Sequence, residues 1–393
     1  MQGLLALDRR IAVVVSANFL AIAARMSLVQ FLGIYFVHRA GIDVTTVGLA
    51  FLCENLARGL LAPMFGALSD RIGRRVLLLT AALSTAVVLP CFLLVKGPAS
   101  LLAWSLLLGA TGAVNMPVSN ALLLDLAPVE RRQSVLALNY TVMSVAYTLG
   151  VVPAGYIAEQ GYGLLAALSA SGYVLVAALY AAALRGPLPV EKGAEAGMAR
   201  DTLAAFRDRR FALFATIAFV FPLSMGLLVT VSPLFAVDRG LGEGYVGLVL
   251  GANSILVAVL AIPVATRIEA QGPFRLLGAA AAIVAMALAC YALIPGAAAA
   301  LLVGTVVYSF GEIIFSSGVP ASVARLAPPG RRGAYQGSWT LVASLSMGSA
   351  LLLSGFISKA AGWGTVWLAF AVLTAAAAAA LFAFRDRFVA PSR

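Results

Sequence analysis

The feature that most limits how this chain can fold is a series of long, continuous apolar runs. Each run is about 20 residues long, the length that a bilayer core requires, and we identify about twelve. They lie at 11–37, 45–66, 76–95, 100–125, 134–158, 162–184, 211–236, 244–267, 274–294, 298–323, 336–358 and 363–384. Charged residues make up only 11% of the 393 residues, against about 25% in soluble domains. Because the runs are continuous and not alternating, they predict an all-α polytopic membrane protein.

Basic residues are divided unequally between the two sides of the predicted membrane. With the amino terminus placed inside, the outer loops hold few of the 27 lysines and arginines, namely Arg39, Lys96, Arg239 and Lys359. An excess of basic residues marks the cytoplasmic side of a membrane protein. We therefore expect a multi-pass protein of the plasma (cytoplasmic) membrane with both termini in the cytoplasm. The net charge of +11 then needs no nucleic-acid partner.

The chain offers few residues for metal binding or catalysis. It has one histidine, His38, so a histidine-built metal site is excluded by count. The three cysteines all lie within apolar runs and are interpreted as small buried hydrophobes. The short loops contain no nucleophile–base arrangement or spaced pair of carboxylates. We therefore expect no enzymatic activity, no cofactor and no metal.

A short basic loop, Gly66 to Arg75, separates the second and third runs and has the pattern G-x-L-x-D-R-x-G-R-R. A generic positive-inside loop would explain the arginines, but not the two glycines and the aspartate at these spacings. The pattern resembles the signature loop of the major facilitator superfamily, which lies between its second and third helices. The resemblance implies a transporter, and it assigns a cytoplasmic gate to Gly66, Asp70, Arg71, Gly73, Arg74 and Asp125, the last being the acid that pairs with the loop arginine.

The two halves of the sequence repeat each other. Leu126-Ala127-Pro128 recurs as Leu326-Ala327-Pro328, and Arg131-Arg132 recurs as Arg331-Arg332 at the same offset. Parallel repeats related by an axis along the membrane normal are a known arrangement in transporters. We predict two pseudo-symmetric six-helix bundles, at 1–185 and 211–393, joined by a cytoplasmic linker at 186–210.

Four ionisable side chains fall deep inside predicted spans: Arg25, Glu54, Arg58 and Glu312. At about 1.5 Å of rise per helical residue, all four lie near the middle of the membrane. Such groups cost at least a few kcal/mol there and indicate a functional site. The family resemblance implies that the first helix lines a central cavity. We predict that the substrate cavity includes these four residues and Asn115.

The acids among these residues have two interpretations. Glu54 and Arg58 are spaced i,i+4 and can pair on one helix face, with Arg25 as a competing partner. The pair is either a permanent buried salt bridge or a carboxylate that exchanges a proton for substrate. Glu312 has no basic residue near it in sequence and is the better candidate for proton coupling, although a protonated structural role is the alternative. We predict proton coupling at Glu312 and Glu54.

The fifth span carries Leu149-Gly150-Val151-Val152-Pro153-Ala154-Gly155, which is similar to a glycine–proline motif of drug–proton antiporters in the superfamily. The chain has fewer glycines than that motif, and its fourth span lacks the membrane arginine that many antiporters carry. With these departures, the resemblance implies proton-coupled export of a hydrophobic or amphipathic small molecule by a monomer in the lipid bilayer. The alternatives are a sugar, peptide or lipid carrier of the same fold, or a facilitator without proton coupling.

Overall fold

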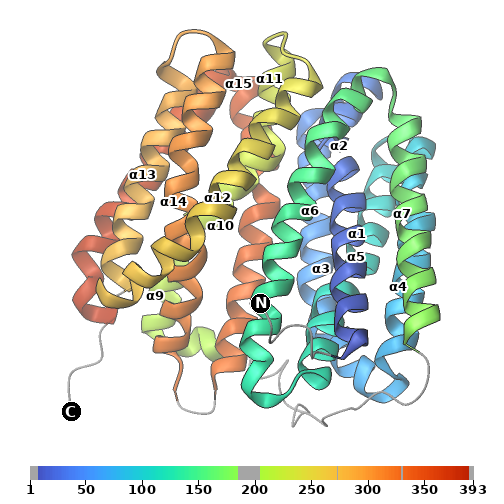
Figure 1. Cartoon of the computed structure of the whole chain (residues 1–393). Helices are drawn as coiled ribbons and strands as arrows, with labels where there is room; N and C mark the ends of the chain where they lie inside the picture. The colour runs from blue at the N-terminus through green and yellow to red at the C-terminus, as the bar shows by residue number, and fades with distance from the viewer. Residues whose placement is uncertain (1–7, 185–203, 272, 329–330, 389–393) are drawn as a thin grey trace.

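The computed structural model describes residues 8–184, 204–271, 273–328 and 331–388, and it places them in helices and connecting loops (Figure 1). The helices are α1 (Arg9–Val29), α2 (Leu32–Ile34), α3 (Val44–Ile72), α4 (Arg74–Val88), α5 (Pro98–Leu126), α6 (Arg132–Gln160), α7 (Tyr162–Ala183), α9 (Arg209–Ala218), α10 (Val220–Gly226), α11 (Ser232–Asp238), α12 (Glu243–Gln271), α13 (Pro273–Leu293), α14 (Ala297–Leu326) and α15 (Arg332–Phe388). Short π-helical segments, Tyr35–Arg39 and Leu227–Val231, continue α2 and α10. The predicted all-α membrane fold is confirmed.

The number of membrane crossings agrees with the sequence pattern. Within the described ranges, 11 helical segments are long and apolar enough to cross a bilayer, and the last of them covers 53 residues. This last segment belongs to α15, which is interrupted at Gly362, where φ is +79°. A positive φ is readily adopted only by glycine, so this residue divides α15 into the two final crossings.

The two halves of the chain are built alike. The first half (α1–α7) and the second half (α9–α15) form neighbouring bundles, coloured blue to green and yellow to red in Figure 1. α5 ends at Leu126 and α14 ends at Leu326, while α6 begins at Arg132 and α15 begins at Arg332. The helix ends thus follow the offset of the sequence repeat. Most of the predicted linker lies outside the described residues, and α9 begins where the Asp208 carboxylate accepts a hydrogen bond from the Arg210 amide (2.9 Å).

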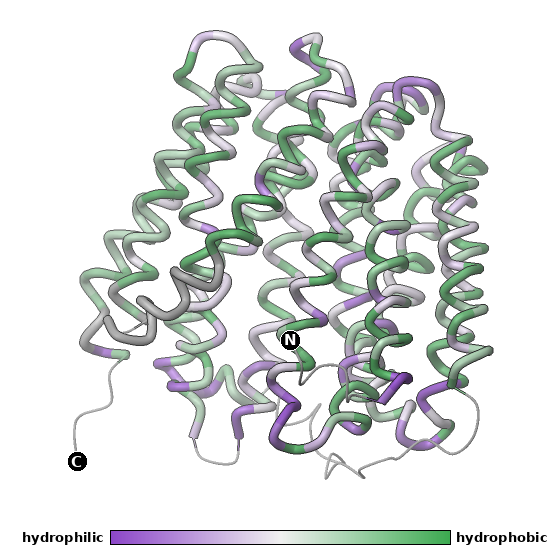
Figure 2. Tube along the Cα trace, in the orientation of Figure 1, coloured by the Kyte–Doolittle hydropathy of each residue, from purple (hydrophilic) through white to green (hydrophobic). Residues whose placement is uncertain are grey.

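The bundle has two ends, which we name by the chain termini. The start of α1 and the end of α15 lie at the lower end in Figure 1, which we call the terminal face, and α2 and α11 lie toward the opposite end, the far face. The hydropathy-coloured trace shows apolar residues along the helices and polar residues gathered near the helix ends (Figure 2). This distribution fits helices that cross a bilayer with their ends at its two surfaces.

Polar contacts join the two halves at the far face. His38 Nε2 lies 3.1 Å from Asp238 Oδ1, and Lys359 forms an ion pair with Asp43. The backbone amide of Gly244 also donates to Glu159 Oε1 (2.8 Å). Each of these contacts links the first half to the second, so the far face is held closed in this structure.

Backbone packing reinforces this closure. α3 packs against α15, and α6 packs against α12. A Cβ atom at Gly48 would overlap the backbone of Leu352, and one at Gly155 would overlap the backbone of Glu243. The glycines therefore permit the close approach of helices from different halves.

Candidate functional site

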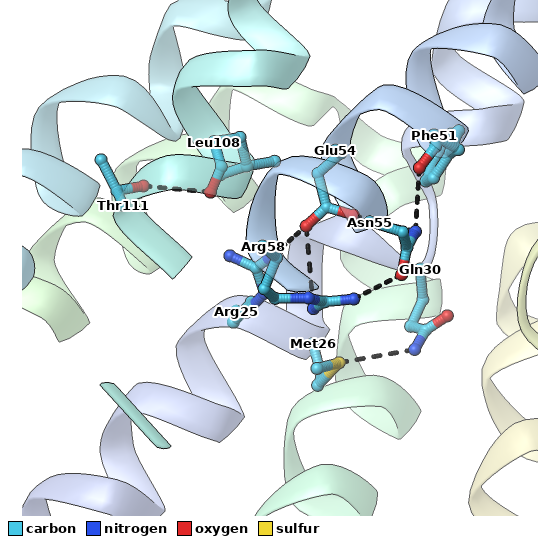
Figure 3. Close-up of polar contacts among 9 residues, drawn as sticks. All are labelled: Arg25, Met26, Gln30, Phe51, Glu54, Asn55, Arg58, Leu108 and Thr111. Atoms are coloured by element: carbon cyan, nitrogen blue, oxygen red, sulfur yellow. Dashed lines mark hydrogen bonds and ion pairs between the residues drawn. The ribbon is translucent and has the colours of Figure 1, made fainter. Parts of the chain in front are cut away.

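A buried ion pair joins the first two spans. Arg25 on α1 donates from Nη2 to Glu54 Oε1 on α3 over 2.6 Å, and Figure 3 shows the two side chains meeting between these helices. The whole residues are only 6% and 5% exposed. An ion pair that is this deeply buried is stable only when its remaining polar atoms are also satisfied.

Neighbouring side chains on α3 extend this ion pair into a cluster. Asn55 Nδ2 donates to Glu54 Oε2 (3.1 Å), and Arg58 Nη2 donates to Asn55 Oδ1 (2.6 Å). Arg58 Nη1 lies 3.7 Å from Glu54 Oε1, so the i,i+4 pair exists but Arg25 is the closer partner (Figure 3). We call Arg25, Glu54, Asn55 and Arg58 the arginine cluster. With two guanidinium groups and one carboxylate, it carries a net charge of +1.

A cavity of about 400 Å³ adjoins the arginine cluster. Both arginines and Asn115 line it, together with Thr340 and Ser344 from the second half. Glu54 is not among the lining residues. The cavity is thus bordered by both halves, as an alternating-access site requires, although most of its wall belongs to the first half.

The structure separates Glu312 from this cavity. We expected one cavity that included both acids, but Glu312 is not among the residues that line it. Glu312 is 8% exposed on α14, and its Oε2 accepts a hydrogen bond from Asn253 Nδ2 on α12 (2.8 Å). Asn253 also donates to Ser309 Oγ (3.0 Å). This α12–α14 contact holds the carboxyl within the second half, and no cation within the described ranges forms an ion pair with it.

A polar contact between the first span and α6 was not predicted from the sequence. Gln30 on the first span donates from Nε2 to the Tyr147 hydroxyl on α6 (3.0 Å). The Glu312 carboxyl interacts electrostatically with Tyr147. The hydrogen bond from Gln30 thus joins α6 to the first span within the first half. Gln30 was recognisable only as an uncharged polar residue inside an apolar run, a pattern that does not identify its partner.

The residues of the predicted gate meet at the terminal face. Arg74 is 5% exposed, and its Nη1 lies 2.7 Å from Asp125 Oδ2. Its Nη2 lies 3.3 Å from Asp70 Oδ1. Gly73 ends α3 with a φ of +93°, which turns the chain directly into α4. The signature loop is therefore anchored on α5 through the Arg74–Asp125 pair, while Gly66 and the exposed Arg71 flank that pair on α3.

Two comparisons with known proteins agree with this architecture. The sequence matches the Major Facilitator Superfamily over residues 14–297 and 246–392. The structure is similar to the nucleoside transporter NupG (TM-score 0.81, 15% identity, covering 96% of this chain and 100% of that chain). It is also similar to the human organic anion transporter MFSD10 (TM-score 0.68, 19% identity, covering 94% and 98%).

A structure of proton-dependent oligopeptide transporters is similar as well (TM-score 0.74, 14% identity, covering 96% and 99%). A search of curated protein sequences finds no match. The structural likenesses show a shared fold at low identity, and the family match covers nearly the whole chain. The chain belongs to the Major Facilitator Superfamily.

Proposed function

We propose that this chain is a proton-coupled transporter that works by alternating access and exports a small amphipathic molecule in exchange for protons. The cavity between the halves would bind the solute, and Glu312 would carry the proton. The glycine–proline segment of α6, which resembles that of antiporters, supports export. The family match supports a transport protein and gives no support for enzymatic chemistry.

The surroundings of Glu312 are the observation on which proton coupling rests. Its carboxyl is buried and bonded by the neutral amide of Asn253. Gain or loss of a proton there does not require an ion pair to break. Glu312 also interacts electrostatically with Tyr140 and Tyr147 on α6. A movement of the halves would therefore change the surroundings of this carboxyl.

Contacts at the two faces support alternating access. The far-face contacts close one side of the cavity in this structure, so we propose that the solute exchanges with the terminal face in this state. The other state must break the His38–Asp238 and Asp43–Lys359 contacts. We further propose that the terminal face is cytoplasmic. The cluster of Asp70, Arg74 and Asp125 is already formed within the first half in this structure, and we propose that it stabilises the state with a closed terminal face through contacts with the second half that form on closure.

Proton flux in proteoliposomes tests this function. Purified protein is reconstituted with a pH-sensitive dye trapped inside, and naphthalenesulfonate, uridine or dialanine is added as the probe. Naphthalenesulfonate is expected to move with protons flowing the opposite way. Glu312→Gln should abolish transport driven by a pH gradient while probe binding is retained, and Glu130→Gln, at an exposed acid of the terminal face, is the matched control.

The same assay distinguishes the proposed export function from a second candidate function, a nucleoside or peptide carrier. The structural likeness to NupG and to oligopeptide transporters favours that candidate. Flux of uridine or dialanine without flux of naphthalenesulfonate would select that candidate. Protons that flow with the solute would contradict export by exchange. Transport of any probe by Glu312→Gln with the pH dependence of the wild type would contradict coupling at this residue.

A further inference from the structure

The charge of the cavity wall narrows the class of solute. Arg25 and Arg58 both line the cavity, and the 21 residues that line it include no aspartate, glutamate or lysine. Glu54 supplies one negative charge against the two positive charges of these guanidinium groups. The cavity wall therefore carries one positive charge that no acidic side chain of the cluster compensates.

One guanidinium nitrogen has an open hydrogen-bonding position. Arg25 is 6% exposed. Its Nη2 is bonded to Glu54 and its guanidinium also interacts with the Tyr173 side chain, but its Nη1 atom has no hydrogen-bond partner. Nη1 lies over Gly112 on α5, where a Cβ atom would come within 3.2 Å of it. A buried charged donor without an acceptor is energetically unfavourable, and a ligand oxygen would relieve that cost.

The rest of the cavity indicates the shape of that ligand. Ile22, Met26 and Met143 provide an apolar and adaptable surface, and Thr111 and Asn115 add neutral polar groups. A volume of about 400 Å³ is within the range for small-molecule sites. Guanidinium groups bind carboxylate-like oxyanions especially well because their donors form a planar fork.

We propose that the solute is an amphipathic organic monoanion whose oxyanion head group binds Arg25 Nη1 and Arg58, with its apolar body against Ile22, Met26 and Met143. This inference rests on the proposed function only in using the same cavity. It does not require proton coupling or a direction of transport, so a binding measurement on the resting protein tests it separately.

Equilibrium dialysis against protein in nanodiscs, with empty nanodiscs subtracted, provides that measurement. Naphthalenesulfonate is compared with its neutral isostere naphthalenesulfonamide and with naphthylmethylammonium. The wild type should bind the sulfonate about tenfold or more tighter than the sulfonamide, as expected for a charge-assisted hydrogen bond to a buried guanidinium. Glu312→Gln should leave this preference unchanged, even if it abolishes proton-driven transport.

Two variants separate the contributions of charge and of geometry. Arg58→Gln keeps the buried Arg25–Glu54 pair intact and removes the net charge, so the preference for the sulfonate should fall severalfold. The double variant Arg25→Gln/Glu54→Gln keeps the net charge of +1 on Arg58 but removes the open donor at Nη1. It should also lose most of the preference, without leaving an unpaired buried carboxylate.

Binding of the sulfonamide by the folded variants serves as the control, since it should not change. Equal affinity of the wild type for sulfonate and sulfonamide would overturn the proposal. So would tighter binding of naphthylmethylammonium, or a sulfonate preference that persists in both variants.

Discussion

Glu54 and Glu312 are both acids buried within apolar helices, one in each half of the molecule, yet their surroundings differ. Glu54 has Arg25 Nη2 at 2.6 Å and Arg58 Nη1 at 3.7 Å. Glu312 accepts a hydrogen bond from the amide of Asn253 at 2.8 Å and has no ion pair among the residues that the structure describes. Both carboxyls are less than a tenth exposed.

The difference shows how the two halves can divide the work of transport. A carboxylate that is fixed between two guanidinium groups is expected to hold those groups at the cavity. A carboxyl that is bonded by neutral groups can gain or lose a proton without leaving a cation unpaired. The first half would then supply solute recognition and the second half proton coupling.

Breaking the buried Arg25–Glu54 pair should have the largest effect on the stability of the protein. Arg25→Met leaves Glu54 with the more distant Arg58 as its ion-pair partner. Removal of one partner of a buried pair costs about 3 kcal/mol of unfolding free energy or more. Glu312→Gln should cost less than about 1 kcal/mol, because its amide can still bond with Asn253. Unfolding by denaturant in detergent micelles measures the loss of stability in each variant. Arg39→Met, at an exposed far-face position, is the control.

The double variant Arg25→Met/Glu54→Gln sharpens this comparison. Because it leaves no unpaired carboxylate, it should recover part of the stability lost in Arg25→Met. Equal losses for Arg25→Met and Glu312→Gln would show that the two acids are held in the same way, which would contradict the division between the halves.

An intermediate effect is expected at the terminal face, where an acid again has a fixed arginine partner. Asp70→Asn removes the weaker of the two contacts of Arg74 and keeps the Arg74–Asp125 pair. It should weaken the state with a closed terminal face. Labelling of Ala62→Cys, at a residue of α3 that lines the cavity, should therefore increase about twofold to fivefold from that face. A membrane-impermeant maleimide on a background without native cysteines measures this.

Matched labelling of the same cysteine from the far face is the control for Asp70→Asn, and it should not rise. Unchanged labelling from the terminal face, together with unchanged transport, would rule out a gating role for Asp70.

The smallest effect is expected at the exposed far-face pair. The hydrogen bond from Lys359, with that from Thr45, lowers the pKa of Asp43 from 3.8 to about 2. Because the pKa of Asp43 is lower in the state with a closed far face, the Asp43–Lys359 pair stabilises that state above about pH 4. This stabilisation is lost as the pH falls through about 2. Both side chains are nearly half exposed, so the pair contributes less than about 1 kcal/mol.

Far-face labelling of Ala62→Cys tests this pair. Lys359→Gln should raise labelling less than about fivefold, and by the same factor at every pH from 5 to 8. A factor that changes across this range would show that Asp43 titrates near neutrality, contrary to the expected low pKa.

The sequence was sufficient to predict the spans, the repeat and the i,i+4 pair, because these depend on local hydropathy and spacing. The second span, expected at 45–66, is Val44–Ile72 in the structure. Two features depend on tertiary packing and could not be predicted from local spacing. One is which of the two candidate arginines lies closer to Glu54, and it is Arg25 on another helix. The other is the position of Glu312 outside the cavity, bonded to Asn253.

The central claim is that Glu312, and not Glu54, gains and loses the proton. Infrared difference spectroscopy of the protein in lipid, recorded as the pH is varied, detects the carbonyl stretch of a protonated carboxyl group directly. We predict a titrating band in the wild type that persists in Glu54→Gln and is absent in Glu312→Gln. A band that persists in Glu312→Gln and disappears in Glu54→Gln would contradict the account.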